Sequence, residues 1–132
     1  RTVQYADFLA SRTSFVLVTI PYEVSRGEVA RSVAAMSKGP NRILGYVENM
    51  SGYYCRECDD IKPLFPPSRD RFGEAGSSTG QSDLAIPCLG TVPFDPELAR
   101  RCDHGIPFSE LADTPVRRAI NRVAQQLLET LS

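Results

Sequence analysis

The sequence lacks several features that mark common classes of protein. It has no tryptophan, a single histidine and no apolar run near the length of about 20 residues that a membrane-spanning helix needs. Residues 1–7 lack the apolar core of a signal peptide. The 15 basic and 16 acidic residues leave a formal net charge of −1, and like charges form no block. We therefore expect neither a membrane nor a nucleic acid as a partner.

The chain also has no G-x-x-x-x-G-K-[ST] motif, the loop and lysine with which many proteins hold the β- and γ-phosphates of a nucleotide. The glycine-rich residues 73–80 do not replace it, because no strand leads into them and no lysine follows. We interpret this segment as a flexible loop. The chain alone is therefore not expected to hydrolyse ATP.

Three short segments are almost continuously apolar: residues 15–20, 43–47 and 86–92. Such segments are typical of strands buried on both faces of a parallel sheet. Between the first two, residues 24–37 place Val29, Val33 and Met36 near one face of a helix. The pattern predicts an α/β fold, with three layers around a sheet of mainly parallel strands.

Two further helices have recognisable starts. Asp95 and Pro96 fit the N-cap and first position of a short helix, and Thr114 and Pro115 do the same for a longer one. The longer helix has an apolar stripe, which we interpret as packing surface: Val116, Ile120, Val123, Leu127 and Leu131.

Three strands are few for a sheet of this class. We therefore expect residues 1–132 to be the C-terminal part of a single larger domain. Residues 1–11 would then form a helix that belongs to a sheet begun upstream. Residues 51–82 are rich in proline, glycine and serine and are expected to be a loop-rich insertion, with a small hairpin beginning near Tyr53 and Tyr54.

That insertion begins with a C-x-x-C pair, Cys55 and Cys58. A chain of this size can build a core without disulfides, so the close spacing favours a chemical role for the pair over a structural disulfide. We therefore expect the protein in the reducing cytoplasm. Two thiolates so spaced can grip one metal ion or cluster edge, but a closed zinc site or a 4Fe-4S cluster requires four ligands. A two-fold dimer would supply all four from two copies.

The other candidate ligands are weaker. Cys88 lies in an apolar segment, where we expect a buried core residue. Cys102 and His104 form a C-x-H that would complete a zinc site, although a histidine beside Gly105 is more often a loop residue.

A dithiol oxidoreductase is the third alternative. Asp59 and Asp60 follow the cysteine pair directly and are expected to raise the pKa of the thiols, which is unfavourable for redox catalysis. We rank this alternative below metal or cluster binding.

Asn49 is expected at the carboxyl end of a buried strand, the edge at which open α/β sheets bind ligands. Its amide offers the donor and the acceptor that match the edge of an adenine ring. Asparagine also ends strands simply because it tolerates turn conformations.

Three stretches occur in a characteristic order: "VLVTIPYEVSRGEVARSV", "VENMSGYYCRECDD" and "IPCLGTVPFDPELARRCDHGIPF". Together, across about residues 13–108, they resemble the C-terminal half of the Mrp/ApbC family. These proteins are deviant P-loop ATPases, related to MinD and ParA, that act as scaffolds or carriers in iron-sulfur cluster assembly. Relatives often have proline after the first cysteine, where this chain has Arg56.

The resemblance implies that Cys55 and Cys58 hold a 4Fe-4S cluster bridged between the subunits of a homodimer, for delivery to recipient apo iron-sulfur proteins. A zinc-stapled dimerisation module with the same four thiolates remains the alternative.

The resemblance also implies that the intact protein binds ATP. Asn49 then contacts the adenine, and Pro93, Phe94 and Asp95 form the other wall of the base pocket. The residues of the family that bind phosphate and magnesium correspond to positions upstream of residue 1.

Overall fold

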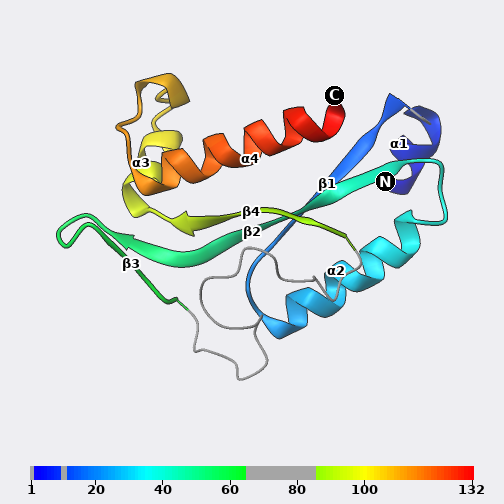
Figure 1. Ribbon diagram of the computed structural model, residues 1–132, viewed down its shortest axis with the longest axis horizontal. Helices are drawn as coiled ribbons and strands as arrows, with labels where there is room; N and C mark the ends of the chain where they lie inside the picture. The colour runs from blue at the N-terminus through cyan, green and yellow to red at the C-terminus, as the bar shows by residue number, and fades with distance from the viewer. Residues whose placement is uncertain (1, 10–11, 65–85) are drawn as a thin grey trace.

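The computed structural model describes residues 2–9, 12–64 and 86–132, so the predicted glycine-rich loop lies outside the described residues (Figure 1). In chain order the elements are α1 (Thr2–Leu9), β1 (Ser14–Thr19), α2 (Glu23–Met36), β2 (Arg42–Cys55), β3 (Asp60–Lys62), β4 (Cys88–Phe94), α3 (Pro96–Asp103), the 3-10 helix η2 (Phe108–Glu110) and α4 (Pro115–Leu131). Helices α2 and α4 lie on opposite faces of the sheet (Figure 1). The predicted α/β class is confirmed.

β2 is the central strand of the sheet. One edge of its first half pairs in parallel with β1, from Ser14 opposite Arg42 to Thr19 opposite Glu48. The other edge pairs in parallel with β4. Tyr53 pairs with both β4 and the antiparallel β3, so β3 continues the edge that β1 occupies earlier. The sheet is thus mainly parallel, as predicted, with one short antiparallel strand.

The second strand is much longer than the predicted residues 43–47. It runs for 14 residues, from Arg42 to Cys55. The reason is pairing, because β4 and then β3 supply partners after β1 has ended at Thr19. Met50 interrupts its regularity with a φ of 55°, between the end of β1 pairing and the start of the hairpin.

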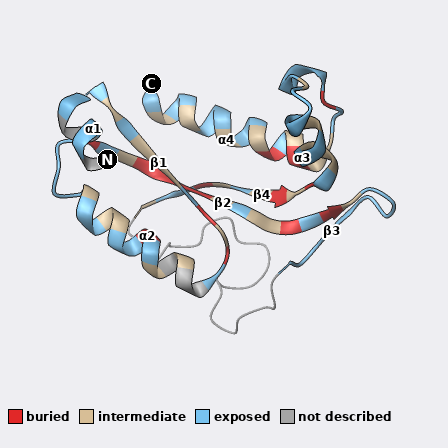
Figure 2. Cartoon of the chain, turned by 180° about the vertical axis from the view of Figure 1, so that it is seen from behind, coloured by how far each residue is buried: buried red, intermediate tan, exposed pale blue. Residues whose placement is uncertain are grey.

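The core lies where the sheet meets its two helices, and Figure 2 shows the buried residues gathered there. Between α2 and the sheet, Val29 of the helix and Tyr46 of β2 are buried together. Leu17, Val33 and Ile86 pack against them. On the other face Val116 and Ala119 of α4 are buried. The predicted stripe of α4 therefore packs most closely at its start, and its last member, Leu131, is exposed.

The structure contains both predicted N-caps. Asp95 accepts a hydrogen bond from the Glu97 N–H at 3.0 Å, and Thr114 accepts one from the Arg117 N–H at 3.2 Å. Each bond satisfies a donor that the first turn of a helix leaves without an intrahelical partner.

The prediction that Cys88 is a core residue is wrong. Cys88 is exposed, and the next residue, Leu89, is buried. Successive side chains of a strand point to opposite faces, so the register of β4 against β2 puts Leu89 inside and leaves Cys88 outside.

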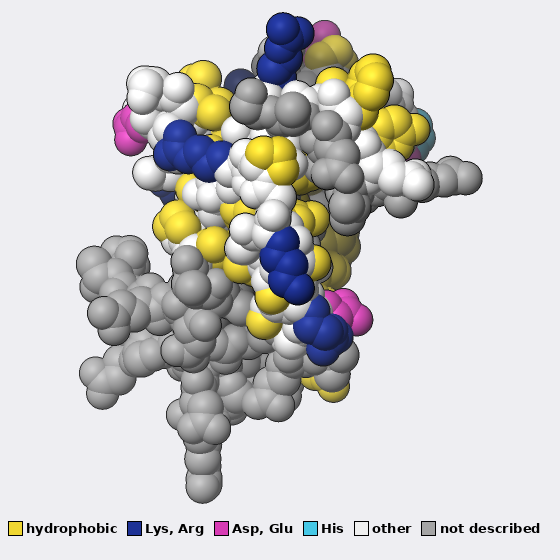
Figure 3. Space-filling view, turned by 90° about the vertical axis from the view of Figure 1, so that its right-hand side faces the viewer, with side chains coloured by type: hydrophobic (Ala, Val, Ile, Leu, Met, Phe, Trp, Pro, Cys, Tyr) yellow, Lys and Arg dark blue, Asp and Glu magenta, His cyan; other side chains and the backbone are white. Residues whose placement is uncertain are grey.

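Among the described helices, none combines the length and the apolar character needed to cross a bilayer. Hydrophobic side chains nevertheless reach the surface, including Phe8 and Val18, which are 84% and 67% exposed. Figure 3 shows such side chains between scattered basic ones on one end of the molecule.

The hairpin of β2 and β3 depends on close backbone contact at Gly52. A Cβ placed there would lie 2.6 Å from Ile61 Cγ2 and 3.0 Å from the Lys62 carbonyl oxygen. The base of the hairpin is also held by Tyr53 and Phe94, whose ring centroids are 6.4 Å apart.

We expect Gly52→Ala to lower the free energy of unfolding by about 1–3 kcal/mol, because the added methyl group forces β3 away from β2. Urea denaturation measures the loss, and hydrogen exchange of residues 60–62 locates it. Gly27→Ala in α2 is the control, since its Cβ meets only the flexible Arg31 side chain at 3.5 Å and is expected to stabilise the helix. Equal stability of Gly52→Ala and the unmodified chain would contradict the expectation.

Candidate functional site

The predicted cysteine pair lies at the tip of the hairpin. Cys55 ends β2 and pairs with Asp60, so residues 56–59 form the turn between the two strands. Cys55 is half-buried and Cys58 is exposed. The two thiols lie in one turn, and each shifts the pKa of the other. The structure thus joins the two predicted ligands into one site.

The electrostatics of the pair favour a thiolate at Cys55. Its pKa is lowered, first by the side-chain hydrogen bond from Cys58, then by the backbone N–H groups of Cys58 and Glu57 and by Lys62. The pKa of Cys58 is raised, chiefly by Cys55. The expectation that Asp59 and Asp60 raise the pKa of both thiols is wrong for Cys55. Donors that face a sulfur stabilise its anionic, metal-binding form.

The acidic residue Asp59 is engaged by the turn itself. The Tyr54 hydroxyl donates a hydrogen bond of 2.6 Å to Asp59 Oδ1, and this bond is the main cause of a raised Tyr54 pKa. Asp59 has a φ of 47°, in the left-handed region, where aspartate is better tolerated than most residues. The buried ring of Tyr54 therefore holds the left-handed turn residue that follows Cys58.

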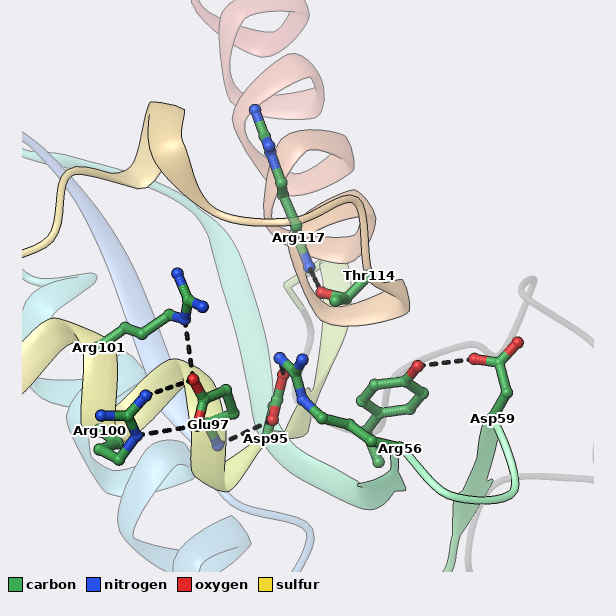
Figure 4. Close-up of polar contacts among 9 residues, drawn as sticks. Arg56, Asp59, Asp95, Glu97, Arg100, Arg101, Thr114 and Arg117 are labelled. Atoms are coloured by element: carbon green, nitrogen blue, oxygen red, sulfur yellow. Dashed lines mark hydrogen bonds and ion pairs between the residues drawn. The ribbon is translucent and has the colours of Figure 1, made fainter.

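Arg56, which lies between the two cysteines in the sequence, reaches the start of α3. Its Nη2 donates to Asp95 Oδ2 at 3.2 Å (Figure 4). The Asp95 side chain is 1% exposed, and its other oxygen caps α3. The hairpin and the start of α3 are thus joined by one ion pair between residues 39 positions apart.

Further ion pairs surround the start of α3. Glu97 accepts hydrogen bonds from Arg100 and Arg101, which lower its pKa to about 2 (Figure 4). Glu97 therefore stays ionised at any physiological pH. Arg117 donates to the Leu111 carbonyl oxygen and lies over the Phe108 ring.

Asn49 does not end its strand as predicted, because β2 continues to Cys55. It is exposed and lies one residue beyond the point where β1 pairing ends. Its Oδ1 accepts a hydrogen bond of 2.9 Å from the Met50 N–H. A cavity of about 310 Å³ opens beside it, between the end of β1 and α2. Its lining includes Leu17, Val18, Thr19, Ile20, Ser25, Glu28, Val29, Ser32 and Asn49.

The other predicted base-pocket residues do not line this cavity. β4 runs beside β2 with Val92 opposite Asn49, so Pro93 follows directly alongside. Phe94 packs against Tyr53, and both carboxylate oxygens of Asp95 have partners within the chain. A base-binding role for these residues stays a prediction.

The second candidate metal pair, Cys102 and His104, does not join the first. Cys102 is exposed on α3, and His104 Nδ1 lies 2.7 Å from the Arg100 carbonyl oxygen. Within residues 2–9, 12–64 and 86–132 no three His, Cys, Asp or Glu side chains group in a way that would hold a metal ion. The cysteine pair of one chain therefore supplies two ligands.

A family model described as ParA, the NUBPL iron-transfer P-loop NTPases, matches residues 2–128. The chain belongs to this family. The match confirms the resemblance to Mrp/ApbC-type proteins and assigns the chain to a group of P-loop NTPases concerned with iron transfer.

A solved structure supports the fold of this NUBPL-type chain. The Pyrococcus furiosus cell division ATPase MinD superposes with a TM-score of 0.60 at 20% identity. The match covers 89% of the present chain and 42% of the MinD chain. This similarity supports the P-loop NTPase fold.

Sequence reasoning missed two residues that shape the site. Tyr54 was placed in a hairpin, but its bond to Asp59 was not foreseen, and the link from Arg56 to Asp95 had no local signal. The only available hint for the second was the departure at Arg56 from the proline that relatives often have.

We expect Cys58→Ala to raise the pKa of Cys55, because it removes the side-chain donor that stabilises the Cys55 thiolate. In a Cys88→Ser, Cys102→Ser background, iodoacetamide alkylation of Cys55 should then slow at any pH below the new pKa. The pH dependence of the rate measures the shift. The reciprocal Cys55→Ala change should lower the pKa of Cys58. An unchanged or lower Cys55 pKa in Cys58→Ala would refute the assignment.

We expect Tyr54→Phe to loosen the turn, because it keeps the buried ring but removes the hydrogen bond to Asp59. Amide exchange in residues 56–59 should become about fivefold faster. Tyr53→Phe, which retains the ring contact with Phe94, is the matched control. If both variants exchange equally fast, the hydroxyl of Tyr54 has no special role.

Proposed function

We propose that this chain is the cluster-binding part of an iron-sulfur carrier ATPase. Cys55 and Cys58 from two copies together hold a 4Fe-4S cluster, which is the cargo that the protein delivers to recipient apo iron-sulfur proteins. The proposal also places the protein in the cytoplasm as a homodimer. The thiol pair at the tip of the hairpin is the main observation in its favour.

The chemistry of the pair suits an iron-sulfur cargo. Iron in such clusters is held by cysteine thiolates, and backbone N–H donors around the sulfur atoms stabilise them. Cys55 has these donors, and Lys62 adds positive charge beside both thiols. The membership of this chain in a family of iron-transfer NTPases points to the same cargo.

The ligand count supports a shared cluster. One hairpin offers two thiolates, whereas a 4Fe-4S cluster takes four. A hairpin with an exposed cysteine at its tip suits an isologous contact, in which the same turn of each copy faces the two-fold axis. The cluster would then be both cargo and link between subunits.

The nucleotide part of the proposal rests on the sheet. Asn49 on β2 and Pro93 and Phe94 on β4 lie on neighbouring strands, and Asp95 follows β4 at the carboxyl side of the sheet, the side at which α/β folds bind ligands. In the proposed ATPase they contact the base. The phosphates would be held by parts of the fold beyond the 132 residues of this chain.

Anaerobic reconstitution with ferrous iron and sulfide tests the cargo. The chain should take up equal amounts of iron and sulfide, about two of each per chain, and double in mass by light scattering. Cys55→Ser, Cys58→Ser should abolish the visible absorbance, the bound iron and the doubling in mass. Cys88→Ser, Cys102→Ser is the matched control and should retain all three.

Two results would overturn the proposal. One is iron uptake and self-association that persist in Cys55→Ser, Cys58→Ser. The other is stoichiometric zinc in freshly purified protein that iron does not replace, which would make the hairpin a zinc-stapled dimerisation module.

A further inference from the structure

Asp95 occupies a junction between two parts of the molecule. Its Oδ1 accepts the Glu97 N–H and caps α3, while its Oδ2 accepts from Arg56. The carboxylate is 1% exposed, so it has lost nearly all contact with water. A buried carboxylate needs such partners, because removing one of them leaves a charge without compensation.

Arg56 is the cation that binds this carboxylate. Two other arginines, Arg101 and Arg117, line the same small cavity beside it. Arg101 donates to Glu97 at 2.9 Å, and Arg117 donates to the Leu111 carbonyl oxygen. Arg56 alone among the three belongs to the cysteine turn. Its backbone follows Cys55 directly, so a shift of its side chain acts on the turn that sets the two sulfur positions.

We propose that the Arg56–Asp95 ion pair couples the Pro93–Asp95 segment to the Cys55–Cys58 turn, so that a nucleotide base against this segment alters metal affinity at the thiols. The coupling deepens the proposed function and rests on it. Arg56 is here a positioning residue that acts through the turn and touches neither the base nor the metal.

The physical basis is thermodynamic linkage. A ligand that favours one position of Asp95 favours one position of Arg56, and therefore one geometry of the sulfur pair. Linkage is reciprocal, so a metal ion on the thiols must in turn restrict the start of α3. This reciprocity allows the coupling to be tested in the 132-residue chain without a nucleotide.

The key variant is Asp95→Asn. Asparagine caps helices as well as aspartate does, so α3 keeps its cap while the ion pair is lost. We expect Asp95→Asn and Arg56→Gln each to weaken Co²⁺ binding at the cysteine pair by about three- to tenfold. The Co²⁺ affinity of the double variant should equal that of the single variant with the lower affinity, since both changes remove the same interaction. Arg56→Lys, which keeps the charge, should recover part of the affinity.

Arg118→Gln is the matched control. Arg118 is paired with Asp113 at 3.2 Å and is 49% exposed, close to the 45% of Arg56, but its partner is 74% exposed, and neither residue lines the cavity beside Arg56 and Asp95. This variant should bind Co²⁺ like the unmodified chain.

Hydrogen exchange provides a readout that a purely structural role would not change. Zn²⁺ should slow amide exchange at residues 97–98 in the unmodified chain, and this slowing should disappear in Arg56→Gln. Unaltered Co²⁺ affinity in Asp95→Asn, additive losses in the double variant, or no Co²⁺ binding at all would overturn the coupling. A chain that binds Co²⁺ with this pattern but takes up no iron-sulfur cluster would refute the proposed cargo and leave the coupling intact.

Discussion

The continuity of β2 is the constraint on which the site depends. A single strand runs from Arg42, inside the sheet, to Cys55, at the base of the thiol turn. β1 and β4 fix its first part, and β4 and β3 fix its end. Because strand side chains alternate with a period of two, this pairing also decides which face each residue presents. The position of Cys55 is therefore set by hydrogen bonds that begin in the core.

The same continuity separates the two predicted binding regions. Asn49 and Cys55 are six residues apart on β2, and the positive φ of Met50 and a register shift against β4 lie between them. Direct contact between a base at Asn49 and a metal at the thiols is thus unfavourable at this spacing. Communication between the two regions would require an intermediary. The ion pair of Arg56 with the buried carboxylate of Asp95 joins the hairpin to α3 and can serve as one.

Local signals in the sequence predicted local structure well. Asp95 with Pro96 and Thr114 with Pro115 marked two helix starts, because capping involves residues within one turn of each other. Signals failed where distant segments decide the outcome. The exposure of Cys88 depends on its register against β2, and the length of β2 depends on partners far along the chain. The pair of Arg56 and Asp95 forms only after the hairpin and α3 have been brought together.

The acidic residues of the turn show why counting charges from the sequence was misleading. Asp59 accepts from Tyr54, and Asp60 Oδ1 accepts the Ile61 N–H at 2.8 Å. Meanwhile the groups that act on Cys55 are mainly donors of its own turn, together with Lys62. Hydrogen-bond direction, which the sequence does not reveal, therefore decides in which direction the pKa of each thiol shifts.

The shortness of β3 has a consequence for how two copies can meet. A long bare strand edge invites other chains to add to the sheet, which leads to uncontrolled aggregation. β3 offers only three residues, all exposed, with Asp60 and Lys62 placing opposite charges at its ends. Such an edge is a poor template for backbone pairing. In the proposed homodimer, the hairpin would therefore bring its thiols to the partner copy without adding a strand of the partner to the edge of β3.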